Sequence, residues 1–230
     1  MNAVILAGGK GRRLRPYTAV FPKPLVPIGD RPILEIIIGQ LRAAGISRMT
    51  LAVGHLASLI QAYFGNGERF GVTIDYSMED EPLGTAGPLG LLDGIEEDFL
   101  VMNGDVLTDL DFRELMAVHR ASNAIGTIAV FEKVVHVTLG VLRLDEAGDV
   151  VDYDEKPSLR YPVSTGIYCF KPAVLGYLHR GEYCDLPDLV RLLVQRGERV
   201  HGYRFGGSWL DIGRAEDYEV AMEWSGGGPA

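Results

Sequence analysis

The sequence predicts an α/β fold in which helices cover both faces of a mainly parallel sheet. Short apolar runs typical of buried strands alternate with amphipathic segments of helical length through the first half of the chain. Two of these runs end in polar, glycine-containing loops, the position at which ligands bind in parallel sheets. With 230 residues, of which 47% are hydrophobic, the chain can bury a full core.

The elements expected in the first half rest on hydrophobic spacing. Residues 32–44 show it most clearly, because isoleucines and leucines recur there at helical intervals and Gly45 follows as a stop. The expected elements are, in order, a strand at 3–7, a helix at 32–44, a strand at 49–53, a helix at 56–64, a strand at 72–76, a helix at 85–92, a strand at 99–102 and a helix at 112–121.

The second half contains more strands and fewer helices, which favours a mixed extension of the same sheet along the other side of a ligand cleft. Its expected elements are strands at 125–131, 140–144, 150–153 and 163–170, helices at 174–178 and 187–196, a strand at 200–205 and a helix at 214–223. No linker separates the halves, so we expect one domain over residues 1–224, with halves 1–110 and 111–224. Residues 225–230 are expected to be disordered.

The first strand leads into a glycine-rich loop crowded with cations, Gly8-Gly9-Lys10-Gly11-Arg12-Arg13, and Lys23 follows in a proline-rich segment. Glycines allow backbone N–H groups to approach an anion, and the cations add full charge, so the loop is expected to hold a polyphosphate. Its spacing matches neither the dinucleotide fingerprint nor a Walker A loop. The alternative is a solvated loop with incidental cations.

Charge and composition exclude several classes of function. The chain has a formal net charge of −9, although residues 1–31 carry six lysines and arginines against one aspartate. A local basic patch suits a small polyanion, whereas duplex nucleic acid favours a broadly basic face. No apolar stretch is long enough to span a membrane, and no secretion signal is expected. Cys169 and Cys184 form no metal or redox motif, so a cytoplasmic location is expected. The five histidines share no spacing and are expected to be structural or exposed.

Seven separated motifs resemble, in order, those of the sugar-1-phosphate nucleotidyltransferases. They are Ala7-Gly8-Gly9-x-Gly11-x-Arg13-Leu14, Pro22-Lys23-Pro24-Leu25, Leu83-Gly84-Thr85-Ala86-Gly87, Asn103-Gly104-Asp105, Glu155-Lys156-Pro157, Ser164-Thr165-Gly166-Ile167-Tyr168 and Trp209-Leu210-Asp211-Ile212-Gly213. The resemblance implies a Rossmann-like, GT-A-like three-layer sandwich with a mixed, mainly parallel central sheet. It also implies the reaction of a nucleoside triphosphate (NTP) with a sugar 1-phosphate to give a nucleoside diphosphate sugar and pyrophosphate.

The resemblance assigns a magnesium site and a triphosphate site. Asp105 and Asp211 are expected to hold Mg²⁺ between the α-phosphate and the sugar phosphate. Arg13 and Lys23 are expected to contact the triphosphate and stabilise the leaving pyrophosphate. Arg12 departs from the family pattern, and it either adds a phosphate contact or points to solvent. Together with Lys156, these positions give the expected catalytic residues Arg13, Lys23, Asp105, Lys156 and Asp211.

The segment 81–89 most resembles mannose-1-phosphate guanylyltransferases and relatives that activate heptoses, so GTP is the expected triphosphate. Gly84 and Gly87 are expected to let a flat base approach the backbone. The expected nucleotide-binding residues are Leu6, Ala7, Gly8, Gly9, Gly11, Arg12, Arg13, Lys23, Glu81, Pro82, Gly84, Thr85, Ala86 and Gly104. Thymidylyl, uridylyl and cytidylyl transfer remain alternatives, as does a non-catalytic paralogue that only binds a sugar nucleotide.

On the sugar side, the resemblance gives Lys156 the sugar phosphate and Glu155 the sugar hydroxyls. Ser164 stands where asparagine is common, which favours a sugar bulkier than mannose or differently configured. The expected sugar-phosphate-binding residues are Asn103, Gly140, Glu155, Lys156, Ser164 and Thr165. The sequence leaves the oligomeric state open, and a homo-oligomer is compatible with it.

Overall fold

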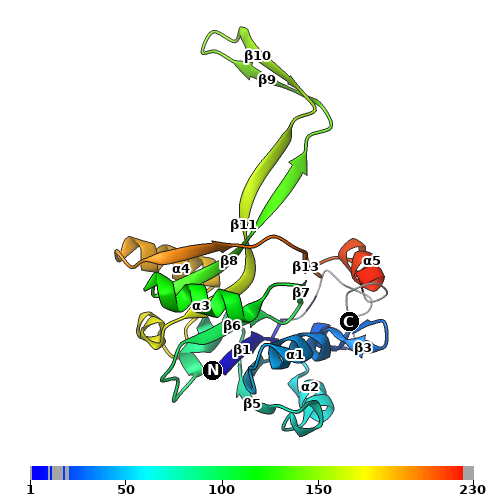
Figure 1. The fold of residues 1–230 in the computed structure, drawn as a ribbon, viewed down its shortest axis with the longest axis vertical. Helices are drawn as coiled ribbons and strands as arrows, with labels where there is room; N and C mark the ends of the chain where they lie inside the picture. Colours follow the sequence, from blue (N-terminus) through cyan, green and yellow to red (C-terminus); the bar gives the residue numbers. More distant parts are fainter. Residues whose placement is uncertain (1, 10, 12–17, 19–20, 225–230) are drawn as a thin grey trace.

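The computed structural model describes residues 2–9, 11, 18 and 21–224, which are built around one seven-stranded sheet (Figure 1). Four of its six pairings are parallel and two are antiparallel, which confirms the mixed, mainly parallel sheet. The strand order is β12 (Val200–Arg204), β8 (Gly126–His136), β11 (Ser158–Phe170), β6 (Phe99–Asn103), β1 (Asn2–Leu6), β4 (Arg48–Val53) and β5 (Thr73–Met78).

The sheet is the middle of three layers. Side chains alternate along β1, so that Ala3 and Ile5 join one buried cluster while Val4 joins another on the opposite face. The first cluster contains residues of α1 (Ile33–Ala43), α2 (Ala57–Phe64), α3 (Phe112–Ser122) and α5 (Ala215–Trp224). The second contains residues of α4 (Leu186–Gln195) and two 3₁₀ helices, η5 (Gly87–Leu91) and η6 (Pro172–Tyr177).

Two expected helices are therefore wrong in type. The segments 85–92 and 174–178 were expected to be α-helical, but only 3₁₀ turns form at η5 and η6. Each turn contains a proline and at least one glycine, which disfavour a continued α-helix. By contrast, the helix expected at 112–121 forms as α3, and the Asp111 carboxylate caps it by accepting hydrogen bonds from the backbone N–H groups of Arg113 and Glu114.

Short elements complete the body. The 3₁₀ turns η3 (Lys23–Leu25) and η4 (Glu68–Phe70) follow the first strand and α2 respectively. Two two-stranded sheets also belong to the body, β2 (Pro27–Ile28) with β3 (Arg31–Pro32) and β7 (Val106–Thr108) with β13 (Trp209–Asp211). Within the described ranges, no helix combines the length and the apolar character that crossing a bilayer requires.

A long ribbon, residues 132–163, projects from the body and is called the arm below (Figure 1). It consists of the outer halves of β8 and β11 and a terminal hairpin of β9 (Gly140–Leu144) and β10 (Val150–Glu155). The neighbours β12 and β6 pair only with residues 126–130 of β8 and 167–170 of β11. The expectation that this region lines the cleft is therefore wrong for the arm as it stands.

Candidate active site

The carboxyl ends of β1, β4, β5 and β6 border one cleft of about 670 Å³. This is the edge of a parallel sheet at which ligands bind, because the strand ends leave backbone groups and loop side chains facing a common space. Its described lining residues are Leu6, Ala7, Gly8, Gly9, Lys23, Pro24, Gly54, His55, Glu79, Asp80, Glu81, Pro82, Gly84, Thr85, Pro88, Asn103, Gly104, Asp105, Tyr183 and Asp211.

The glycine-rich loop lies at the centre of that edge. Gly104 N–H donates to the Leu6 carbonyl at 2.9 Å, and a Cβ on Gly104 would lie 2.9 Å from the same oxygen, so glycine allows β6 and β1 to end together. Gly11 has φ +57°, and its carbonyl accepts a hydrogen bond from the Thr18 hydroxyl at 2.6 Å. Arg12 and Arg13 lie outside the described residues, so their roles stay predictions.

Lys23 and Asp105 form an ion pair in the cleft. Both side chains are largely withdrawn from solvent, with 11% and 25% of their surface exposed. Lys23 is held by the first turn of η3, in which the Val26 N–H donates to the Lys23 carbonyl at 3.0 Å. The Asp105 Oδ2 atom accepts from Lys23, whereas its buried Oδ1 atom has no hydrogen-bond partner among the described residues.

Asp211 comes from a distant part of the sequence to the same place. The strand β13 pairs with β7, which sets Asp211 opposite Val106, and the Ile212 N–H donates to the Asp105 carbonyl at 3.0 Å. The indole N–H of Trp209 donates to the Thr165 carbonyl at 2.9 Å and fixes β13 against the central sheet. Asp105 directly precedes Val106 of β7, and Val106 pairs with Asp211 of β13. The β7–β13 pairing therefore brings the two predicted metal ligands close together.

This donor set fits Mg²⁺, which in phosphate-handling sites binds one or two carboxylates and takes its other ligands from phosphates and water. The unpartnered Oδ1 atom of Asp105 is available for such a ligand. Among the described residues no cluster of three acidic, histidine or cysteine side chains forms, so a metal here would depend on substrate oxygens. In this structure the Lys23 ammonium group balances the charge of Asp105.

Glu79 is a cleft residue that the sequence analysis missed. It follows β5 directly, its N–H donates to the Val53 carbonyl at 2.9 Å, and its Oε2 atom accepts from the Leu83 N–H at 2.9 Å. Partial burial raises the pKa of this carboxyl, and the Leu83 hydrogen bond opposes that shift. Its Oε1 atom occupies the space where a side chain on Gly8 would project. The expected strand at 72–76 ended two residues before the end of β5, so Glu79 was not recognised as the residue that follows the strand.

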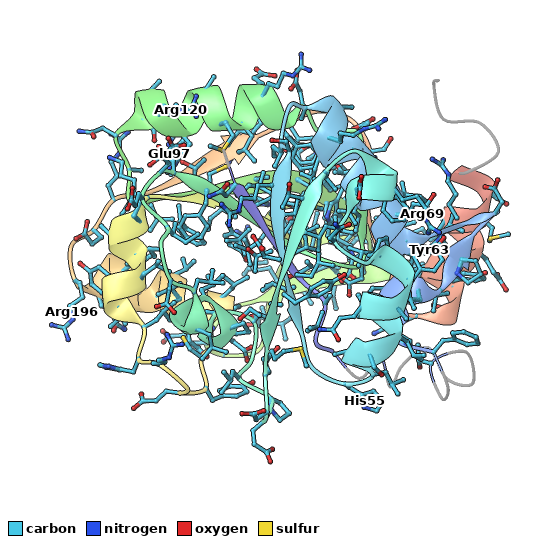
Figure 2. All side chains as sticks on the ribbon, turned by 90° about the horizontal axis from the view of Figure 1, so that it is seen from below. His55, Tyr63, Arg69, Glu97, Arg120 and Arg196 are labelled. Atoms are coloured by element: carbon cyan, nitrogen blue, oxygen red, sulfur yellow. The ribbon has the colours of Figure 1, made fainter. Side chains whose placement is uncertain are left out.

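Gly54 and His55 were missed in the same way, although they directly follow the strand β4 beside β1. The expectation that the histidines are structural or exposed holds for His55 as to exposure, and Figure 2 shows its side chain at the periphery of the molecule. The loop position alone could have drawn attention to it, because every strand end at this edge borders the cleft.

The expected reason for the glycines at 84 and 87 needs correction. A Cβ on Gly84 would lie 2.5 Å from the Cys184 carbonyl oxygen, and one on Gly87 would lie 2.6 Å from the Glu182 carbonyl oxygen. These glycines therefore allow the segment to pack on the backbone of residues 182–184. The N–H groups of Ala86 and Gly87 both donate to the Cys184 carbonyl, at 2.8 and 2.9 Å.

Thr85 is engaged in the same contact while also bordering the cleft. Its hydroxyl donates to the Asp185 carboxylate at 3.1 Å and accepts from the Leu186 N–H at 2.7 Å. Ala86 is fully buried and does not line the cleft, whereas Glu81, Pro82 and Gly84 do.

Of the predicted sugar-side residues, Asn103 alone lines the cleft among the described residues. Its Oδ1 atom is buried and has no hydrogen-bond partner within the described part of the chain. Thr165 is buried, with its hydroxyl donating to the Ala129 carbonyl at 2.8 Å, and the Ser164 hydroxyl lies 2.9 Å from the Tyr168 hydroxyl. Both belong to the base of the arm.

Gly140, Glu155 and Lys156 lie on the arm, away from the cleft lining. Lys156 Nζ lies 3.5 Å from Glu155 Oε1, and the Tyr153 hydroxyl donates to Glu155 Oε2 at 2.8 Å. Lys156 also has φ +51°, a left-handed conformation that a non-glycine residue adopts at a cost in strain. The structure thus keeps the predicted sugar-phosphate lysine apart from Lys23 and the two aspartates.

The chain is similar in sequence to known nucleotidyltransferases. The chain is 37% identical to the UTP–glucose-1-phosphate uridylyltransferase of Synechocystis sp., over 96% of this chain and 62% of that protein. It is 34% identical to the mannose-1-phosphate guanyltransferase beta-A of Xenopus laevis, over 96% of this chain and 64% of that protein. The chain thus spans a little under two thirds of the length of these curated relatives.

A solved structure with the same fold is that of a Bacillus anthracis protein assigned as a glucose-1-phosphate thymidylyltransferase, in complex with a sucrose. It superposes with a TM-score of 0.78 at 25% identity, covering 98% of this chain and 95% of that one. A family model described as nucleotidyl transferase matches residues 2–224. The chain therefore belongs to the nucleotidyl transferase family.

Proposed function

We propose that this protein transfers a nucleoside monophosphate, preferably GMP from GTP, to a sugar 1-phosphate and releases pyrophosphate. The observation that carries this proposal is the Lys23–Asp105 ion pair, which lies with Asp211 in the cleft that Gly8 and Gly9 of the glycine-rich loop also line. A cation, two carboxylates and clustered backbone N–H groups are what a reaction between two phosphates requires.

In this reaction an oxygen of the sugar phosphate attacks the α-phosphorus of the triphosphate in line, and the bond to the bridging oxygen of pyrophosphate breaks. The N–H groups of Gly8 and Gly9 hold the triphosphate, and Lys23 leaves Asp105 to neutralise the departing pyrophosphate. Asp105 and Asp211 are the residues that would hold Mg²⁺, which when bound neutralises charge on the α-phosphate and the sugar phosphate. Arg13 is proposed to assist Lys23, as the family motif implies.

Glu79 favours guanine over the other bases. A carboxylate only accepts hydrogen bonds, and the Watson–Crick edge of guanine offers two adjacent donors, N1–H and N2–H. Uracil and thymine offer one donor flanked by carbonyl acceptors, which the carboxylate repels. Glu79 lies at the end of the cleft bordered by Glu81, Pro82 and Gly84, the segment in which the sequence motif indicated a nucleobase pocket.

The test measures pyrophosphate release from GTP, UTP, dTTP and CTP, each with a panel of sugar 1-phosphates and Mg²⁺. We expect turnover with at least one sugar 1-phosphate and the highest kcat/KM with GTP. Absence of turnover with every pair would contradict the proposal. If a sugar nucleotide then bound tightly, the protein would be the non-catalytic paralogue.

A further inference from the structure

The arm exposes a large share of the apolar surface of this protein. Of the nineteen large hydrophobic side chains that are exposed in the described part of the chain, eleven lie between residues 134 and 161. No residue from 132 to 164 is buried. A two-stranded ribbon with both faces in water is marginally stable by itself, so a surface is needed to cover it.

The arm also carries the residues that the cleft lacks. Lys156 and Glu155 belong to the motif that the family resemblance assigns to the sugar phosphate, yet neither lines the cleft. Lys156 adopts a strained φ of +51°, and such strain is often found in functional segments. Five carboxylates and one lysine line the described part of the cleft, so an incoming ammonium group would meet a complementary charge.

The arm leaves the body at the edge where the cleft opens. Strand β11 is antiparallel to β6, with Ile167 opposite Met102, so its residues before 167 extend beyond the carboxyl end of β6. Lys156 is eight residues from Ser164, which is up to about 26 Å of extended chain. Figure 1 shows the arm projecting from the body, and Lys156 is not among the residues that line the cleft.

The base of the arm resists folding back. The β8–β11 ladder is regular from Ser158, opposite His136, to Ser164, opposite Val130, and its register shifts only beyond Ser164. At that shift Thr165 is buried, its hydroxyl donates to the Ala129 carbonyl at 2.8 Å, and its carbonyl accepts from Trp209 at 2.9 Å. A sharp bend at this point would break both hydrogen bonds.

We propose that the arm docks on a second copy of this chain and delivers Lys156 to the cleft of that copy. Two copies exchange arms reciprocally, so that each cleft contains Lys23, Asp105 and Asp211 of one chain and Lys156 of the other. The role given to Lys156 rests on the proposed function, whereas the exchange of arms rests on the exposed apolar surface and the locked base.

The exchange itself is tested by sedimentation of the full chain, without reference to activity. We expect a dimer that Val150→Asp on β10 shifts to monomer and that Val194→Asp on α4 leaves intact. The two valines are equally exposed, at 59%, and both substitutions add the same charge. Circular dichroism should confirm that both variants keep the fold. A monomeric unsubstituted chain, or equal dissociation by both substitutions, would overturn the proposal.

The delivery of Lys156 is tested by mixing two inactive variants, Lys156→Ala and Asp105→Asn, through co-expression. With exchanged arms, a mixed dimer has one cleft that carries both lesions and one that carries neither. Random pairing should restore about a quarter of the wild-type activity, because half of the dimers are mixed and each has one intact cleft. No restoration by the mixture, or full activity of Lys156→Ala alone, would overturn the delivery.

A cross-linking measurement keeps this result separate from the proposed function. A short bismaleimide should join Lys156→Cys on one copy to His55→Cys on another, in a Cys184→Ser background. Linkage between chains supports the exchange even if no substrate pair is turned over. Linkage only within a single chain that carries both cysteines would show the arm on its own cleft and overturn the proposal.

Discussion

Replacing Glu79 by glutamine should change which base the cleft prefers while leaving the local structure in place. The glutamine side chain has the same shape, and its amide oxygen can still accept the Leu83 N–H that Glu79 binds at 2.9 Å. The substitution replaces one acceptor by an NH₂ donor. One of the two guanine donors, N1–H or N2–H, then faces the NH₂ donor of the glutamine. Uracil can instead donate its N3–H to the amide oxygen and accept from the NH₂ group at O4.

The magnitude follows from the hydrogen bonds at stake. A bidentate contact between a side chain and a base edge is worth about 1–3 kcal/mol of discrimination, or about 5- to 150-fold. Because Glu79 is partly buried, water replaces a lost contact poorly. We therefore expect the fall in kcat/KM for GTP to lie in the upper part of this range. The gain in kcat/KM for UTP should be smaller than this fall, because the rest of the pocket keeps its shape.

The assay compares kcat/KM for GTP and UTP with one sugar 1-phosphate, measured as pyrophosphate release. Glu68→Gln is the matched control, because it removes the same charge from an exposed side chain in η4 outside the cleft lining. We expect the GTP/UTP ratio to fall at least about fivefold for Glu79→Gln and to stay constant for Glu68→Gln. An unchanged ratio for Glu79→Gln would refute the assignment of Glu79 to the base.

Three further predictions address pH, packing and the metal. Burial raises the pKa of Glu79, so KM for GTP should rise as pH falls, beginning above the range of an ordinary glutamate; in Glu79→Gln this dependence should vanish. Gly84 and Gly94 both have positive φ, but a Cβ meets the Cys184 carbonyl only at Gly84, so urea unfolding should find Gly84→Ala about 1–3 kcal/mol less stable than Gly94→Ala. Asp105→Asn, like removal of Mg²⁺ by a chelator, should lower pyrophosphate release at least about 100-fold, and thermal melting should still show a folded protein.

The centre of the sheet could be predicted because β1 and β6 are short, buried and mostly apolar on both faces. Residues 99–102 show this, because all four are buried in β6 and the chain after them passes directly to the cleft at Asn103, Gly104 and Asp105. The convergence of Asp105 and Asp211 came from the family resemblance. Spacing could not have predicted this convergence, because the two aspartates are 106 positions apart in the sequence and are brought together by the β7–β13 pairing.

Glu79 and the glycines at 84 and 87 show what local patterns miss. The expected strand ended at residue 76, whereas β5 continues through Ser77 and Met78, which are not buried. The glycines were correctly recognised as points of close approach, but the approaching group is the backbone of residues 182–184, about 100 residues later in the chain. A single sequence can indicate that a position has no room for a side chain. It does not indicate which other part of the chain fills that space.

The arm shows a deeper limit. Residues 140–144 and 150–155 were expected as strands and form as strands, since valines and leucines there favour an extended backbone. Apolar residues also predict burial, and within this chain that burial does not occur. Both statements agree if the covering surface belongs to another molecule. In the proposed exchanged pair the apolar residues of the arm are buried against the other copy, and Lys156 of one copy lies near Asp105 of the other. The rule that apolar residues are buried then holds for the arm as it does for the body.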